Sequence, residues 1–220
     1  MPKATFENLP EVKRKLIEEA AFNEFADQGF DNASINRIVK EADIAKGSFY
    51  QYFEDKGDLY KYILDCIGER KLAYISPILE NPADHDFFTL LEEIYRVGLA
   101  FARDNPRAGH IGFEVYKNQS NPLFKEIYQE SMEKGRAFFG NLLELAISKG
   151  TVDPQINTGF IIHMLIYLQV ASFDYYFDSI EIGEMKSGTW AVDVMPTVEL
   201  MINFIKNGIQ MPNEGVFTDD

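Results

Sequence analysis

The sequence has little of what several protein classes need. It holds a single cysteine, Cys66, so an internal disulfide framework is excluded and a reducing, cytoplasmic location is expected. The N-terminal stretch MPKATFENLPEVKRKLIEE has none of the apolar core of a signal peptide. The most apolar run, residues 160–173, is too short to span a bilayer. We therefore expect no membrane partner, and we interpret residues 160–173 as a buried helix.

Signatures of catalysis are missing as well. The chain has no Gly-rich phosphate loop and no nucleophile elbow, and its 3 histidines and 1 cysteine lack metal-ligand spacing. The closest acidic pairs, such as Glu18-Glu19, are adjacent on predicted helices and cannot face one another. We therefore expect a protein that is not an enzyme and that has no cofactor and no metal site.

Positive charge is scarce, with 21 Lys and Arg against 35 Asp and Glu and a net charge of -14. A polyanion would repel such a molecule as a whole, which disfavours indiscriminate binding to nucleic acid. The excess of acid is mainly C-terminal, because residues 1–60 hold 8 basic and 12 acidic residues and residues 61–220 hold 13 and 23. The charge pattern is therefore compatible with a local basic patch near the N-terminus.

What is present is helical periodicity along almost the whole chain, without an alternating strand pattern. Gly, Pro and Asn residues break this periodicity at short connections. The pattern predicts an all-α fold of about nine helices, at residues 11–28, 35–42, 46–53, 56–79, 86–104, 108–117, 122–149, 155–178 and 189–206. Ser34 is expected to cap the second of these helices.

The predicted helix at residues 46–53 is only about two turns long, and isolated helices of this length are marginal in water. Phe49 and Phe53 lie one turn apart, so we expect them to pin this helix to its neighbours while its polar residues face outward. A short helix that is held rigidly by the helix before it and exposes a polar face is the helix-turn-helix arrangement.

The stretch from Ile17 to Leu59 resembles the DNA-binding region of the TetR family of bacterial transcriptional regulators. The resemblance rests on Ile17, Ala20-Ala21, Phe25, Gly29-Phe30, Ser34-Ile35, Ile38, Ala42, Ile44, Gly47-Ser48-Phe49-Tyr50, Tyr52-Phe53, Lys56 and Leu59, and the run KGSFYQYFEDK is its most specific part. Two positions depart from the pattern. Asp43 stands where the family usually has a turn Gly, and Asp tolerates left-handed backbone better than most residues do. Ala45 stands where a Ser or Thr usually caps the third helix, and losing such a cap typically costs about 1 kcal/mol.

The resemblance implies which side chains face DNA. Base contacts are expected from the second and third helices, through Lys46, Gly47, Ser48, Tyr50, Gln51 and Asn36. Phosphate contacts are expected from Ser34, Arg37, Tyr52 and Lys56. Gly47 has no Cβ, so the helix can approach the duplex closely, and Lys46 can donate to guanine. Taken alone, Tyr50 and Tyr52 would be partly buried structural residues and Arg37 part of a solvated helix face.

The C-terminal remainder is expected to bind an effector and to dimerise. We place the domain boundary at residue 55, with residues 1–55 as the DNA-binding domain, residues 56–220 as the second domain, and the helix at residues 56–79 as the link. Two recognition helices that lie about 34 Å apart on successive major grooves require a homodimer. Its expected interface comprises Phe160, Met164, Leu168, Val198, Met201 and Ile205, although some apolar residues of these two helices must be intramolecular core.

The middle helices are rich in aromatic residues, which either fill a core or line a pocket. The resemblance implies an effector cavity, with Phe113, Tyr116, Tyr128, Phe138, His163 and Tyr167 as candidate lining residues. An aromatic cation and a fatty or acyl compound are both open as ligands. The prediction is a homodimeric repressor that an unidentified small molecule releases from operator DNA. The alternative is a non-catalytic adaptor that uses the helix-turn-helix for protein docking, although docking gives no reason for polar groups at phosphate-contact positions.

Overall fold

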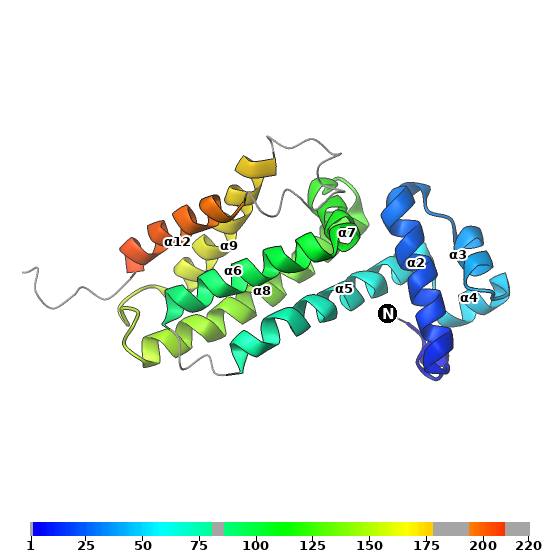
Figure 1. Cartoon of the computed structure of the whole chain (residues 1–220), viewed down its shortest axis with the longest axis horizontal. Helices are drawn as coiled ribbons and strands as arrows, with labels where there is room; N and C mark the ends of the chain where they lie inside the picture. The colour runs from blue at the N-terminus through cyan, green and yellow to red at the C-terminus, as the bar shows by residue number, and fades with distance from the viewer. Residues whose placement is uncertain (1, 81–85, 178–193, 210–220) are drawn as a thin grey trace, which may run out of the picture. The chain divides into compact units, whose positions relative to one another are not determined.

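The computed structural model describes residues 2–80, 86–177 and 194–209 (Figure 1). Within these ranges it contains helices and no strand, which confirms the predicted all-α fold. The helices are α1 (Ala4–Glu7), α2 (Glu11–Asn32), α3 (Ile35–Glu41), α4 (Lys46–Tyr52), α5 (Lys56–Leu79), α6 (Phe87–Asp104), α7 (Pro106–Lys117), α8 (Pro122–Ser148), α9 (Thr158–Phe177) and α12 (Met195–Ile209). The start of the helix predicted at residues 189–206 lies outside the described residues, and α1 is a helix that the periodicity does not predict.

The chain divides into two compact units. Unit 1 comprises Met1–Ala73 and Asn105–Tyr128, and unit 2 comprises Tyr74–Asp104 and Gln129–Asp220. This division differs from the boundary expected at residue 55, because the first part of α5, all of α7 and the start of α8 belong to unit 1. The physical reason is that buried residues of α5, α7 and α8, including Tyr60, Ile111 and Phe124, share one hydrophobic core with α2 to α4.

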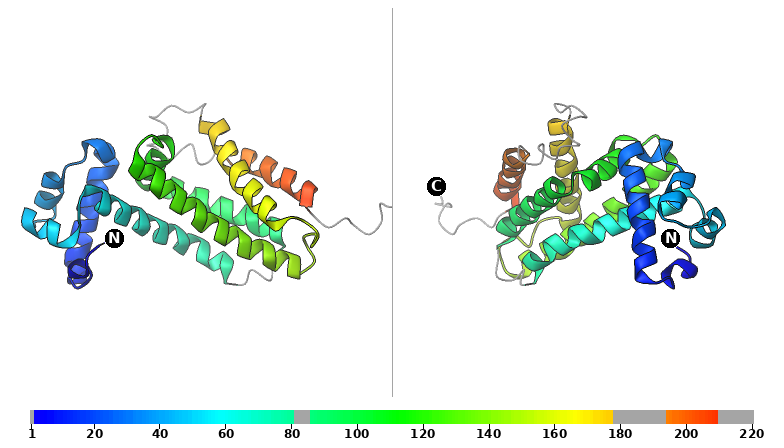
Figure 2. Two further views of the ribbon diagram at one scale, coloured as in Figure 1. Left: turned by 180° about the vertical axis from the view of Figure 1, so that it is seen from behind. Right: turned by 45° about the vertical axis from the view of Figure 1, so that its right-hand side comes forward.

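In unit 1, α3 and α4 lie side by side and α3 packs against α2, as both views of Figure 2 show. Aromatic rings fill the space behind them: the ring centroids of Phe25 and Tyr60 are 4.8 Å apart, and those of Phe49 and Phe53 are 5.8 Å apart. Large aromatic rings dominate the energy of such a core. Helices α2, α3 and α4 are therefore supported from behind by a core that contains these aromatic rings.

The end of α2 depends on Gly29, whose φ of 69° interrupts the helical backbone. An L-residue rarely adopts this left-handed conformation, and glycine does so without a Cβ penalty. A Cβ at this position would also lie 2.9 Å from Oε1 of Glu114 on α7. The chain therefore turns here from α2 toward α3, and the Gly29-Phe30 pair is fixed by both backbone and side-chain geometry.

In unit 2, α12 packs against α6 and α9. The buried face of α6 is rich in large apolar residues, including Phe88, Leu91 and Ile94, which follow a helical period. The end of α5 joins this unit through Tyr74, whose ring centroid is 5.2 Å from that of Phe101. None of the helices in the described part of the chain combines the length and apolar character needed to cross a membrane.

Candidate nucleic-acid interface

The two faces of α4 differ as the sequence predicts. Phe49 and Phe53 have 0% of their surface exposed and belong to one hydrophobic core with residues of α2 and α5, so their prediction as core residues is confirmed. On the opposite face Tyr50 is 47% exposed. The other exposed or half-exposed positions of this face are Lys46, Gly47, Ser48 and Gln51. A short helix thus presents a basic, hydroxyl, phenol and amide group to solvent from a rigid support.

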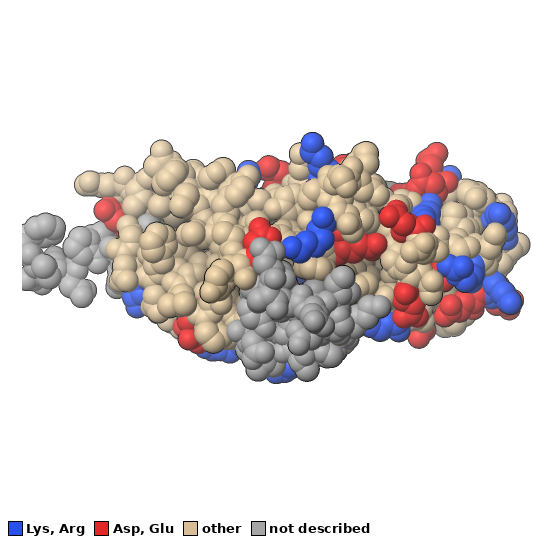
Figure 3. Space-filling view, turned by 90° about the horizontal axis from the view of Figure 1, so that it is seen from above, with Lys and Arg blue, Asp and Glu red and all other residues tan. Residues whose placement is uncertain are grey.

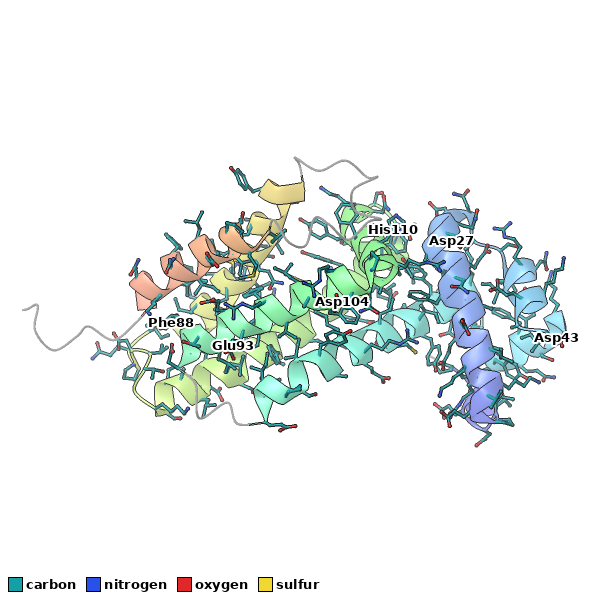
Figure 4. All side chains as sticks on the ribbon, in the orientation of Figure 1. Asp27, Asp43, Phe88, Glu93, Asp104 and His110 are labelled. Carbon is teal, nitrogen blue, oxygen red and sulfur yellow. The ribbon has the colours of Figure 1, made fainter. Side chains whose placement is uncertain are left out.

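The turn between α3 and α4 is tight and has the left-handed residue that the sequence suggests. Asp43, labelled in Figure 4, has a φ of 50°. The amide of Ile44 donates to the carbonyl of Val39 at 3.0 Å, which closes the turn. Ala45 occupies the N-cap of α4 and supplies no side-chain cap. The start of α4 therefore has backbone hydrogen bonds but no side-chain cap.

Arg37, an expected phosphate contact, is held by an ion pair. Its Nε donates to Oε1 of Glu24 at 2.8 Å, and its Nη2 donates to the carbonyl of Asn32 at 2.7 Å. Its side chain remains 54% exposed while Glu24 is buried. The guanidinium is therefore oriented by α2, and it still reaches solvent.

Glu24 holds Arg37 and Ser34 in place, and the sequence pattern does not predict this role. Burial acts to raise the pKa of its carboxyl, but the hydrogen bonds from Arg37 and from the Ser34 amide outweigh burial, so the pKa lies below its usual value. The Ser34 amide donates to Oε1 of Glu24 at 2.7 Å. An acidic residue beside the apolar stripe of α2 was the available signal, since buried carboxylates need partners.

Ser34 lies at the N-cap of α3 with extended backbone, but its side chain makes no capping hydrogen bond. The expectation of a Ser34 side-chain cap is therefore wrong. The carboxylate of Glu24 instead fixes the start of α3 in another way, because it accepts the amide of Ser34 and binds the Arg37 side chain of the first turn. Asn36, in the same turn, is exposed.

The structure gives Lys56 a role different from the expected phosphate contact. Its Nζ donates to three backbone carbonyls: that of Phe30 at 2.6 Å, that of Ala33 at 3.1 Å and that of Asp31 at 3.2 Å. The ammonium also lies 4.6 Å from the centroid of the Phe30 ring. The carbonyls of the α2–α3 connection thus use the donors of Lys56, and the residue ties α5 to that connection.

The structure also gives Tyr52 a role different from the expected phosphate contact. It is buried, with its ring centroid 6.0 Å from that of Phe6 on α1. A buried ring in the core of unit 1 is the structural role that Tyr52 would have without the motif. The burial has a simple cause, because Tyr52 belongs to the last turn of α4 and α1 covers that turn.

Helix α7 is anchored to α2 at two points. Nη2 of Arg107 donates to Asp27 at 2.8 Å; Asp27 is labelled on α2 in Figure 4. Further along α7, Glu114 accepts the amide of Phe30 at 2.9 Å and the hydroxyl of Tyr60 at 3.0 Å. Burial, followed by the neighbouring Glu114 carboxylate, raises the pKa of Tyr60, so it stays a donor. These contacts explain why α7 belongs to unit 1.

The expected dimer residues divide between a buried and an exposed set. Val198, Met201 and Ile205 of α12 are buried within unit 2, with Val198 only 2% exposed, so their assignment to the dimer surface is wrong. The exposed apolar residues of α12 are Leu200 at 71% and Phe204 at 67%. On α9 the remaining predicted residues are more accessible: Phe160 is exposed, and Met164 and Leu168 are half-buried.

The six expected pocket residues divide between the two units of the chain. Phe113, Tyr116 and Tyr128 belong to unit 1 and are half-buried, whereas Phe138, His163 and Tyr167 belong to unit 2. His163 and Tyr167 are exposed on α9 with their ring centroids 4.4 Å apart, so the structure does not support them as lining of an enclosed cavity. They lie one turn apart on the same face of α9 as exposed Phe160.

Unit 2 has an apolar hollow between α9 and α12. It has a volume of about 450 Å³, and residues such as Phe160, Met164, Leu168 and Phe204 line it. In the view from above, the surface over α9 and α12 has few charged side chains outside the grey atoms (Figure 3). Among the described residues there is no group of three or more His, Cys, Asp or Glu side chains that could hold a metal ion.

Comparison with known proteins agrees with this geometry. A family model described as bacterial regulatory proteins, tetR family, matches residues 17–63. A TetR family transcriptional regulator from Chloroflexus aurantiacus J-10-FL, known from its crystal structure, is 30% identical, and the match covers 96% of this chain and 100% of that chain with a TM-score of 0.64. The chain belongs to the TetR family. Because TetR family proteins are transcriptional regulators, membership in the family identifies this chain as a regulator rather than an enzyme, as predicted.

Further relatives of this TetR family member include curated proteins that match over part of the chain and solved structures that match over most of it. A curated HTH-type transcriptional regulator from Staphylococcus aureus strain bovine RF122 is 42% identical over 119 residues, 53% of this chain and 62% of the relative. One from strain USA300 is 45% identical over 51 residues, so the matched part of this chain covers 28% of that relative. A transcriptional regulator from Cytophaga hutchinsonii has a TM-score of 0.65 at 17% identity, covering 91% of this chain and all of that chain, which shows the shared fold alone.

Proposed function

We propose that this TetR family member is a homodimeric transcriptional repressor that binds operator DNA through α4 and that a small-molecule ligand releases. The observation that carries the proposal is the division of α4 into two faces, with Phe49 and Phe53 completely buried and Lys46, Ser48, Tyr50 and Gln51 turned to solvent or half-exposed. A rigid, short helix with this polar face has the size and chemistry that a major groove accepts.

The roles within the interface follow from the contacts. Lys46, Gly47, Ser48, Tyr50, Gln51 and Asn36 are proposed to reach bases. Arg37 is proposed to bind a phosphate while Glu24 orients its guanidinium, since positioning contacts to the backbone need a fixed donor. Ser34 remains a proposed phosphate neighbour. Lys56 and Tyr52 have structural roles instead, because Lys56 holds the α2–α3 connection and Tyr52 is buried.

The homodimer is proposed to form through α9 and α12, with a second copy of this chain as the partner. Support comes from the exposed apolar side chains Phe160, Leu200 and Phe204, which a monomer would leave in water. Dimerisation is typical of the TetR family and would place two α4 helices on one duplex. The hollow between α9 and α12 would then be covered by the partner.

Ligand-relieved repression is proposed from family membership and the linking helices. Both α5 and α8 run from unit 1 into unit 2, so a ligand that prefers one arrangement of unit 2 can change the orientation of unit 1. The aromatic groups Phe113, Tyr116 and Tyr128 in unit 1 and Phe138 in unit 2 remain candidates for ligand contact. The chemical class of the ligand is open.

Binding to the DNA upstream of the protein's own gene tests the proposal. We expect tight binding in fluorescence anisotropy that weakens steeply as salt rises, because phosphate contacts release counterions. Lys46→Ala should change which sequence is preferred. Binding that is equal on operator and scrambled duplexes, or absent in both, would contradict the proposal and favour the adaptor alternative.

A further inference from the structure

The last carbonyls of α4 have an unusual set of partners. The final four carbonyls of any α-helix lack intrahelical donors and need partners from elsewhere. In α4 the carbonyl of Phe49 accepts the Phe53 amide at 2.9 Å. The other three carbonyls accept from the N-terminal segment, residues far away in the sequence. This accounts for every orphan carbonyl at the end of α4.

Two residues before and within α1 supply those three donors. The Lys3 amide donates to the carbonyl of Tyr52 at 2.8 Å, and Lys3 Nζ donates to that of Tyr50 at 3.1 Å. The Thr5 hydroxyl donates to the carbonyl of Gln51. The Lys3 ammonium also places positive charge at the C-terminal end of α4, where it interacts favourably with the negative end of the helix dipole.

An aromatic ring fixes this segment to the same core that supports α4. Phe6 is only 1% exposed, and its ring centroid lies 4.8 Å from that of Phe53 and 5.2 Å from that of Tyr62. The carbonyl of Glu7 accepts Nη1 of Arg14 at 3.1 Å, which ties α1 to α2. The donors at residues 3 and 5 are therefore held in place and do not belong to a loose end.

The opposite end of α4 makes this support consequential. Ala45 offers no side-chain cap, and a seven-residue helix does not hold its own shape in water. Tyr50 and Gln51, whose carbonyls the segment binds, are also two of the proposed base-contacting residues. Anything that fixes their backbone fixes the direction in which their side chains leave α4.

We propose that Lys3, Thr5 and Phe6 form an N-terminal clamp that sets the orientation of α4, with Lys3 and Thr5 as positioning residues for base readout. This inference rests on the proposed function, since it assigns a specificity role to residues that need not touch DNA. The clamp lies outside residues 17–63, to which the family model aligns. It is thus a feature of this chain beyond the matched motif.

Conservative variants test the clamp without emptying the core. Thr5→Val removes the hydroxyl donor and keeps the shape, Lys3→Met removes the ammonium and keeps the aliphatic stem, and Thr5→Ser keeps the hydroxyl. Lys125→Met, at an exposed position of α8 in unit 1, is the control that changes charge equally. A thermal melt of each variant checks that it folds.

Two measurements then decide. Amide hydrogen exchange of residues 49–53 in the free protein should accelerate about threefold to tenfold in Thr5→Val and Lys3→Met, as loss of one hydrogen bond implies, and stay at the parent rate in Thr5→Ser and Lys125→Met. The ratio of affinities for operator and scrambled duplex should fall by a similar factor in the first two variants. A purely structural loss of folded protein would lower both affinities together and leave this ratio unchanged.

The outcomes separate the clamp from the proposed function. Unchanged exchange in both variants overturns the clamp, whatever happens on DNA. Accelerated exchange with an unchanged affinity ratio overturns the positioning role. If Lys3→Met only lowers the salt slope by about one, Lys3 is a direct phosphate contact and the clamp assignment of Lys3 is wrong. If the parent itself does not discriminate between the duplexes, the proposed function fails, and the exchange rates alone decide the clamp.

Discussion

Replacing Lys56 by Met separates a structural role from a DNA-contact role. Lys56 Nζ donates to the carbonyls of Phe30, Asp31 and Ala33 and lies over the Phe30 ring. A hydrogen bond to a charged group contributes about 1.5 to 3 kcal/mol and an exposed cation–π contact about 0.5 kcal/mol, and here three bonds share one half-exposed ammonium. Lys56→Met should therefore lower the free energy of unfolding by about 2 to 3 kcal/mol.

Urea unfolding followed by far-ultraviolet circular dichroism measures this change. Lys125→Met is the matched control, since exposed side chains away from specific contacts change stability by less than about 0.5 kcal/mol. Amide exchange of residues 30–38 should accelerate in Lys56→Met and remain unchanged in the control. These residues include the α2–α3 connection that the ammonium holds.

A phosphate contact at Lys56 would behave differently. Unfolding would match the control within about 0.5 kcal/mol, while the salt slope of operator binding would fall by about one. That pair of results would refute the structural role that we assign to Lys56.

Three further predictions concern the buried carboxylate of Glu24 and the two faces of α12. The folded pKa of Glu24 lies below its reference value of 4.5, so its contribution to stability is present above about pH 4.5 and is lost as pH falls through the folded pKa. In Glu24→Gln the free energy of unfolding should therefore depend less on pH in this range. A pH dependence equal to that of the parent would contradict the ion pair with Arg37. Phe204→Glu should shift sedimentation from dimer to monomer, because the charge enters the proposed interface. Val198→Ala should keep the dimer but lower the free energy of unfolding by about 2 kcal/mol, and dissociation by Val198→Ala instead would reverse our assignment of the two faces of α12.

The sequence predicts α4 well because local spacing decides its faces. Phe49 and Phe53 are one turn apart, and that relation holds in any packing of a helix. The left-handed turn at Asp43 is likewise a local property, which residue type indicates. Such features need no knowledge of which distant element packs on them.

Lys56 shows where the prediction fails. Its three acceptors are carbonyls 23 to 26 residues earlier, and nothing in the sequence places them beside the start of α5. A lysine at this motif position has the same sequence signature whether it binds phosphate or backbone. The clamp by Lys3 and Thr5 is hidden for the same reason, since its acceptors lie 46 or more residues away.

α12 illustrates a different limit. It carries apolar residues on two faces, one with Val198, Met201 and Ile205 and the other with Leu200 and Phe204. Helical periodicity identifies both stripes but does not say which faces the core and which faces a partner. The stripe predicted as the dimer surface, with Val198, Met201 and Ile205, is the one that is buried inside unit 2.

Operator affinity of Gly47→Ala tests the central claim most directly, namely that the exposed face of α4 lies against DNA. A Cβ at Gly47 has no heavy atom within 4 Å in the free protein, and Ala favours a helix over Gly by up to about 1 kcal/mol, so folding should be unchanged or slightly improved. On a duplex the added methyl group would meet the groove, and affinity should fall at least about tenfold, the equivalent of about 1.4 kcal/mol. Operator binding as tight as that of the parent, in a variant that folds as well, would contradict the account.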